Sequence, residues 1–131
     1  MAEFSDPDSK LGASPLPSGD QLTIDVVREH LPNLFLHDGS QAERERVLAH
    51  YRPEPAIPFT NKVALTDEGF GAVEKVYIKT LNDEVISSGL QDRMIAAAGI
   101  RTVYWLETSH SPFLSRPHAV ADILLEIGQQ T

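Results

Sequence analysis

Two short apolar runs, residues 75–80 and 102–106, constrain the fold of this chain more than any other part of the sequence. Both runs are rich in β-branched and aromatic residues, which favour strands, and each ends in a polar turn. The segment between them is long enough for one helix. Two neighbouring strands joined by a helix must run parallel, and such crossovers are right-handed in nearly all cases. The sequence therefore predicts an α/β unit whose two strands end at the same edge of a sheet.

Helix signals surround these two strands. Either serine of the pair 87–88 can cap a helix that ends near Ala98, and Gly99 is well placed as the C-terminal cap. A final helix is predicted over residues 115–127, with Pro117 in the first turn, where no backbone N–H is needed. The order of elements is therefore strand, helix, strand, helix.

The first half of the chain is less regular than the second. Residues 1–21 hold several proline, glycine and serine residues, and we expect irregular chain there. Residues 22–71 are expected to form a mostly helical segment, in which 22–24 is long enough for no more than an edge strand. Residues 72–131 carry the α/β unit.

Two helices are predicted within residues 22–71. Asp25 can cap a short helix, which Pro32 would end because it interferes with continuation of the helix. Ser40 and Glu43 fit a capping box, in which side chain and backbone bond reciprocally, for a second helix that runs to about Tyr51.

A sheet of only two strands would be incomplete. Parallel strands are normally flanked on both edges and covered on both faces, and a two-stranded sheet is marginal by itself. We therefore expect this chain to be part of something larger, with the missing neighbours either upstream of Met1 or on another polypeptide, such as a second copy.

The composition excludes several classes of partner and site. The net charge of -8 argues against nucleic acid or an anionic membrane surface as the main partner, since both bind proteins through a basic patch. The absence of cysteine excludes disulfides, thiolate metal sites and a cysteine nucleophile. No metal or other cofactor is expected, because His30, His37, His50 and His118 have no partners at metal-ligand spacing.

No targeting or membrane segment is visible in the sequence. No apolar run approaches the roughly 18 residues that a membrane span requires. Residues 1–6 have neither the basic region nor the apolar region of a signal peptide. We therefore expect a cytoplasmic protein.

Asp83 and His110 follow the two strands, at the edge where ligands bind in open parallel sheets. Adjacent strands lie about 4.8 Å apart, so these two side chains should come within hydrogen-bonding reach. A carboxylate bonded to one imidazole nitrogen fixes the tautomer and leaves the other nitrogen as a general base. The plainer alternative is that Asp83 only makes an Asx turn before the helix and that His110 is a solvated turn residue.

The same stretches resemble the C-terminal half of an α/β-hydrolase. Residues 75–86 are similar to the strand and acid loop of that family, and residues 91–95 to the helix that follows. Residues 108–113 are similar to the histidine loop, and 117–127 to the terminal helix. The branch concerned contains plant methylesterases, hydroxynitrile lyases and their bacterial esterase relatives. Residues 22–70 look like the cap over that family's active site.

The resemblance implies a catalytic triad. Asp83 would be its acid and His110 its base, and the nucleophile would be a serine in a Gly-x-Ser-x-Gly elbow beside oxyanion donors. Nothing upstream of Asp83 fits such an elbow, because Ser14 and Ser18 lie among prolines and Ser40 fits a helix cap. The nucleophile and the first half of the fold are therefore expected to lie outside this chain.

Three interpretations of function remain open. The first is the acid–histidine half of a serine ester hydrolase that acts on a small ester under an apolar cap containing Leu34, Phe35 and Leu36. Hydroxynitrile lyases carry a lysine directly after the histidine, whereas this chain has Ser111. This difference favours an esterase over a hydroxynitrile lyase. The second is an inactive hydrolase remnant that binds a small molecule or a protein. The third, an unrelated α/β binding module, requires the acid and the histidine to lie far apart.

Overall fold

The two predicted strands are present and pair in parallel in the computed structural model, which describes residues 5–12 and 14–130. Strand β4 (Val76–Thr80) lies beside strand β5 (Thr102–Leu106), in a register that places Thr80 opposite Leu106. Within the described residues this sheet has no third strand. Both strands therefore begin and end level with each other.

Helix α4 (Ser88–Ala97) makes the crossover between the two strands. Ser87 caps its first turn by accepting a hydrogen bond from the Leu90 N–H at 3.1 Å. Gly99 takes a φ of +62°, the left-handed conformation that commonly ends a helix. Both predicted caps are confirmed.

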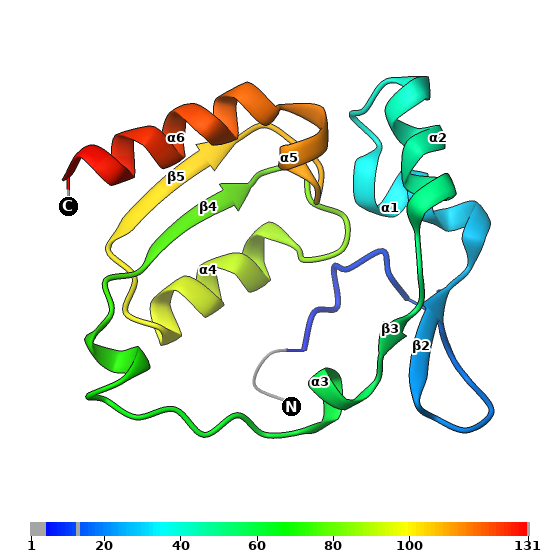
Figure 1. The fold of residues 1–131 in the computed structure, drawn as a ribbon, viewed down its shortest axis with the longest axis horizontal. Helices are drawn as coiled ribbons and strands as arrows, with labels where there is room; N and C mark the ends of the chain where they lie inside the picture. The colour runs from blue at the N-terminus through cyan, green and yellow to red at the C-terminus, as the bar shows by residue number, and fades with distance from the viewer. Residues whose placement is uncertain (1–4, 13, 131) are drawn as a thin grey trace.

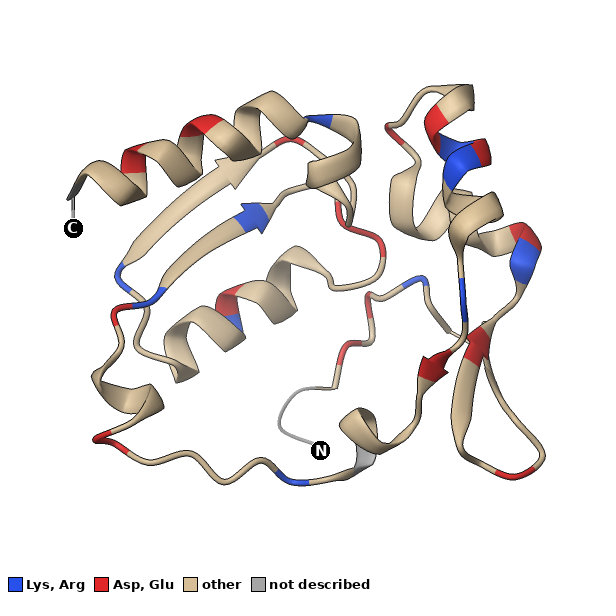
Figure 2. Cartoon of the chain, in the orientation of Figure 1, with Lys and Arg blue, Asp and Glu red and all other residues tan. Residues whose placement is uncertain are grey.

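Helices cover the two faces of the β4–β5 pair. In Figure 1, α4 and α6 (Pro117–Gln130) lie on opposite sides of the strands. Lys79 Nζ of β4 bonds to Asp92 on α4 at 2.5 Å, and the Tyr104 hydroxyl of β5 donates to Glu126 on α6 at 2.9 Å. Lys79 is the one charged residue in the two strands (Figure 2). The sheet is thus largely apolar and sandwiched between helices.

The C-terminal helical region is divided in two. The sequence predicts one helix over residues 115–127, whereas the structure has α5 (Pro112–Ser115) followed by α6. Arg116 lies between them with φ of -136° and ψ of 53°, because the ring of Pro117 disfavours the helical conformation for the preceding residue. Pro117 then begins α6, which continues beyond the predicted end at residue 127.

A small antiparallel sheet precedes the α/β unit. Strand β2 (Thr23–Val26) lies at its centre, between β1 (Pro15–Pro17) and β3 (Glu54–Pro55). The expectation of irregular chain up to residue 21 misses β1, and β2 is a central rather than an edge strand. All three prolines lie in the outer strands, where a missing N–H costs least.

The first predicted helix is wrong in its position. Asp25, the predicted cap, lies in β2, and its carboxylate accepts the Val26 N–H at 2.7 Å. A 3₁₀ turn, η2 (Arg28–His30), leads into α1 (Leu31–Leu36), and Pro32 lies in the first turn of α1. A proline is tolerated there because the first N–H groups of a helix have no partner, so Pro32 lies in the first turn of this helix rather than ending an earlier one.

Helix α1 supplies most of the buried apolar side chains. Leu31, Leu34 and Leu36 are at most 5% exposed, and Ala56 and Leu90 complete the buried apolar set of the described residues. The buried apolar set is therefore small and lies mostly on α1, which packs against α2 and α5.

Helix α2 (Gln41–His50) begins with the predicted capping box. Ser40 N donates to Glu43 Oε2 at 2.7 Å, and Glu43 N donates to Ser40 Oγ at 3.4 Å. Figure 2 shows charges of both signs on this helix. Arg44 donates to Asn33 on α1, which holds the two helices together.

A long connection links the two halves of the chain. It contains α3 (Ile57–Thr60) and the 3₁₀ turn η3 (Phe70–Ala72), and the residues from 61 to 74 are exposed. Figure 1 shows it running along the side of the molecule opposite α6. In the part of the chain that the structure describes, none of the helices combines the length and apolar character of a membrane span.

Gln91 of α4 joins three parts of the α/β unit. Its side-chain oxygen accepts the Thr80 N–H at 3.0 Å, and its amide nitrogen donates to Thr80 O at 2.8 Å and to Ile86 O at 3.0 Å. The side chain is only 1% exposed. It therefore satisfies buried backbone groups where β4 ends and the following loop begins.

Gln91→Leu should lower the free energy of unfolding by about 2–5 kcal/mol, because it leaves buried backbone groups unpaired. Urea unfolding measures this change. The control is Gln41→Leu, which removes an exposed bond to Glu45 and should cost less than about 0.5 kcal/mol. If both variants lowered the free energy of unfolding by the same small amount, the role given to Gln91 would be contradicted.

Candidate functional site

Asp83 and His110 meet at the carboxyl edge of the parallel strands. His110 Nδ1 lies 2.9 Å from Asp83 Oδ2 and 3.1 Å from Asp83 Oδ1. The predicted approach of these two side chains is therefore confirmed, and the interpretation that requires them far apart is wrong. Their catalytic role stays a prediction.

The loop after β4 fixes the Asp83 carboxylate. Its Oδ1 accepts the N–H groups of Val85 and Ile86 at 2.8 and 2.9 Å, and its Oδ2 accepts the Thr80 hydroxyl at 2.9 Å. The turn that the plainer alternative predicts is thus present together with the bond to His110. Both oxygens have partners, so the carboxylate is held in one orientation.

The Asp83 carboxyl is 3% exposed, and burial by itself raises its pKa. The hydrogen bond to His110, the bonds from the Ile86 and Val85 N–H groups and the nearby imidazole act in the opposite direction. Together they hold the pKa of Asp83 below its usual value of 3.8. Asp83 is therefore an ionised acceptor at neutral pH, as orientation of an imidazole requires.

His110 presents its second nitrogen away from the acid. Its side chain is 28% exposed, and within residues 5–12 and 14–130 Nε2 makes no hydrogen bond. The Phe35 ring meets the imidazole edge to face, with centroids 5.3 Å apart. Nε2 is thus the atom that could take or give a proton.

The histidine loop is anchored to the turn after α1. Asp38 Oδ2 accepts the Ser109 N–H at 3.1 Å and the Ser115 hydroxyl at 2.9 Å, and Oδ1 accepts the Ser109 hydroxyl. Burial raises the pKa of Asp38, but the bonds from Ser109 and Ser115 outweigh it and hold that pKa below the usual value. Sequence reasoning missed these contacts because Ser109 is 71 residues away from Asp38 along the chain.

The apolar cap predicted over the site is only partly present. Phe35 reaches His110, but Leu34 and Leu36 are 5% and 0% exposed and belong to the core. The reason is helical geometry: Phe35 points to a different side of α1 from its two neighbours. Leu34 and Leu36 therefore offer no apolar surface beside His110.

The serines that sequence analysis considered are engaged elsewhere. The Ser14 hydroxyl lies 2.9 Å from His30 Nδ1, Ser18 donates to Asp20 at 2.5 Å, and Ser40 caps α2. In the described part of the chain, none of the three is bonded to His110. None of these three serines is therefore placed to give its proton to His110.

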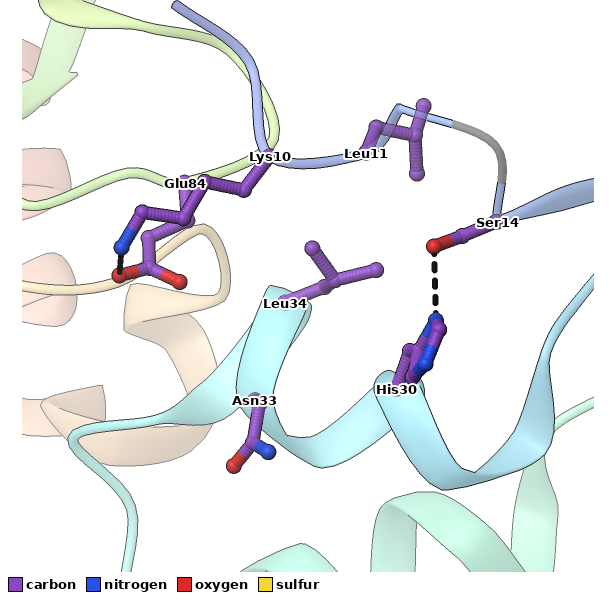
Figure 3. Close-up of a pocket in the computed structure, with 7 residues that line it drawn as sticks. All are labelled: Lys10, Leu11, Ser14, His30, Asn33, Leu34 and Glu84. Carbon is purple, nitrogen blue, oxygen red and sulfur yellow. Dashed lines mark hydrogen bonds and ion pairs between the residues drawn. The ribbon is translucent and has the colours of Figure 1, made fainter.

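A cavity of about 430 Å³ adjoins the acid loop (Figure 3). Figure 3 shows the Ser14–His30 pair on one side of it and the ion pair of Lys10 with Glu84 on the other. Its lining residues are Lys10, Leu11, Ser14, His30, Asn33, Leu34 and Glu84. Neither member of the Asp83–His110 pair lines this cavity.

The remaining histidines bond to other groups or face solvent. His37 Nε2 donates to Asn82 O at 2.8 Å, and His50 and His118 are exposed. No three side chains of histidine, cysteine, aspartate or glutamate gather in metal-binding geometry among the described residues.

The chain is similar in sequence to plant methylesterases. Methylesterase 17 of Arabidopsis thaliana is 31% identical over 121 residues, which are 89% of this chain and 44% of that relative. The chloroplastic methylesterase 11 of the same plant is 33% identical over 107 residues, which are 81% of this chain and 27% of that relative. The chain thus spans less than half of these curated relatives. No model of a protein family matches it.

The fold is similar to that of solved α/β-hydrolases. Polyneuridine aldehyde esterase matches 96% of this chain with a TM-score of 0.77 and 18% identity. A methylesterase from Arabidopsis matches 94% with a TM-score of 0.77 and 23% identity. In both cases the match covers 52% of the solved chain. The predicted fold class, part of an α/β-hydrolase, is therefore confirmed.

Asp83→Asn should flatten the dependence of stability on pH. The lowered pKa of Asp83 means that its ionised form stabilises the folded state. This contribution is fully present above the ordinary pKa and is lost as pH falls through the lowered pKa. The free energy of unfolding of Asp83→Asn should consequently fall less between about pH 5 and pH 2 than that of the unchanged chain.

Urea unfolding at several pH values in this range measures the difference. Asp67→Asn, which removes an exposed carboxylate in the long connection, is the control and should follow the unchanged chain. An unaltered pH dependence in Asp83→Asn would contradict the strong engagement of this carboxylate.

Proposed function

The chain is a homologue of plant methylesterases and has part of their α/β-hydrolase fold, and we propose that it supplies the acid–base half of an ester hydrolase. Asp83 orients His110, and the nucleophilic serine comes from outside these 131 residues. The hydrogen bond between Asp83 and His110, at the ends of two parallel strands, carries this proposal.

The proposed chemistry moves one proton through His110 Nε2. As a serine oxygen bonds to the ester carbonyl carbon, Nε2 takes the proton of that hydroxyl, and Asp83 stabilises the imidazolium that forms. The carbon–oxygen bond to the alcohol then breaks, and Nε2 returns the proton to the leaving oxygen. Water repeats the exchange on the acyl-enzyme, which releases the acid and the free serine.

Two further observations support a nucleophile from outside the chain. The Thr108 hydroxyl oxygen, at the start of the histidine loop, is buried and has no hydrogen-bond partner among the described residues, which is unusual for a buried polar atom. Trp105 of β5 is 63% exposed on a sheet of two strands. Both features are expected of a surface that another segment or polypeptide completes.

The proposed substrate is a small ester of a carboxylic acid. The names of the relatives support a methyl ester as the first compound to test. The ring of Phe35, which lies against His110, supports an apolar group next to the reacting carbon. The net charge of -8 favours neutral rather than anionic substrates.

The 131-residue chain by itself should not hydrolyse a short methyl ester such as methyl butyrate, because His110 Nε2 has no serine to activate. The rate of acid release at constant pH measures this. The matched control is His110→Ala, which should give the same background rate. Turnover by the unchanged chain that His110→Ala abolishes would contradict the proposal that the nucleophile lies elsewhere.

A protein that joins the reading frame upstream of codon 1 to this chain should hydrolyse the same ester. His110→Ala should lower its kcat/KM by about 10²–10⁴-fold, the usual contribution of a general base. Asp20→Asn, which changes a turn in the antiparallel sheet, should leave kcat/KM unchanged. An extended protein that is inactive would favour the binding remnant, and activity that survives His110→Ala would contradict the role of His110.

A further inference from the structure

The end of α1 contacts both loops that carry the Asp83–His110 pair. Asp38 bonds to Ser109, the residue immediately before His110. The ring of Phe35 packs against the His110 imidazole, and the Phe35 carbonyl oxygen lies 3.3 Å from the Ser109 hydroxyl oxygen. Residues 35–38, which we call the clamp, therefore contact the histidine loop at three points.

The same segment also contacts the acid loop. His37 Nε2 donates to the carbonyl oxygen of Asn82 at 2.8 Å, and Asn82 immediately precedes Asp83. One short segment thus bonds to the residue before the acid and to the residue before the histidine. These contacts join positions that are 45 and 71 residues apart in the chain.

We propose that the clamp, residues 35–38, positions the Asp83–His110 pair, with Asp38 as the positioning residue for His110. The inference rests on the proposed function, since it assigns the clamp a role in that site. Asp38 acts through the Ser109 backbone and side chain, and no atom of Asp38 needs to contact the substrate.

The geometry of the loops explains why such a clamp is needed. Asp83 and His110 each lie several residues beyond a strand end, so independent motion of either loop would change the distance from Nδ1 to Oδ2. A catalytic pair works only when its members are held within a fraction of an ångström. Anchoring both loops to the same segment makes them move together.

The chemistry of Asp38 suits this role. Ser109 is 0% exposed, and Asp38 accepts both its N–H and its hydroxyl. Asparagine at position 38 would keep the size of the side chain but replace an acceptor oxygen with an N–H donor. That amide nitrogen would face a hydroxyl of Ser109 or Ser115, which would have to turn and accept instead of donating. The remaining bonds would also lose the negative charge of the carboxylate, so the anchor would weaken.

The test is the exchange rate of the His110 Nδ1 proton in the 131-residue chain. A proton hydrogen-bonded to a buried carboxylate gives a separate downfield proton resonance, which His110→Gln identifies by its loss. Asp38→Asn should speed the exchange of this proton with solvent about tenfold or more, because the loop opens more often. Ser109→Ala should also speed the exchange. The variant with both substitutions should exchange little faster than Asp38→Asn alone, since the two residues form one interaction.

The matched control is Asp20→Asn. Asp20 accepts the Ser18 hydroxyl and the Leu22 N–H, much as Asp38 accepts the hydroxyl and N–H of Ser109, but it lies in the turn between β1 and β2, and Asp38 also accepts the Ser115 hydroxyl. This variant should leave the His110 proton unchanged, although it also removes a carboxylate with two bonds. If Asp38→Asn acted only by lowering the stability of the fold, Asp20→Asn would speed the exchange of the His110 proton as well. Faster exchange in Asp38→Asn alone indicates positioning.

The outcomes separate the two proposals. A folded Asp38→Asn variant whose His110 proton exchanges at the unchanged rate would overturn the clamp and leave the proposed function intact. If the unchanged chain gave no such resonance, the Asp83–His110 bond that supports the proposed function would be contradicted. If Asp38→Asn did not fold, Ser109→Ala would decide, because it removes a single hydroxyl.

Discussion

The parallel pairing of β4 with β5 is the constraint on which the site depends. Its register makes both strands end level, and backbone bonds continue past their ends, from Leu81 N to Leu106 O at 2.9 Å and from Asn82 N to Thr108 O at 3.1 Å. The acid loop and the histidine loop therefore leave the sheet side by side. An aspartate and a histidine that are 27 residues apart in the chain meet as a consequence.

Polar side chains, more than apolar ones, hold this edge of the sheet in place. Gln91 satisfies the backbone at the end of β4, and Asp38 satisfies the backbone and hydroxyl of Ser109. Gln91, Thr108 and Ser109 are among the most deeply buried side chains, whereas the buried apolar set is small and centred on α1. Buried hydrogen bonds impose direction as well as proximity, which the orientation of an imidazole requires.

Local signals predicted the α/β unit from the sequence, and contacts distant in the chain were missed. The β-branched and aromatic runs of the strands, the Ser87 cap and the Gly99 cap are each recognised within a few residues. Pro32 was misread because one proline can end a helix or begin one, and only the packing of α1 decides between them. Neither anchor matches a local pattern. Asp38 bonds to Ser109, 71 residues away, and Gln91 bonds to Thr80, 11 residues away, on a different element.

The most direct test of the central claim uses a fluorophosphonate, which labels activated serines covalently. The probe is applied to the protein that joins the upstream reading frame to this chain, and the labelled serine is identified. Peptide mapping by mass spectrometry locates the adduct. We predict one labelled serine outside the 131 residues, with labelling that Asp83→Asn weakens and His110→Ala abolishes. Labelling of a serine within this chain, or labelling that survives His110→Ala, would contradict the proposal that this chain is the acid–base half of an ester hydrolase.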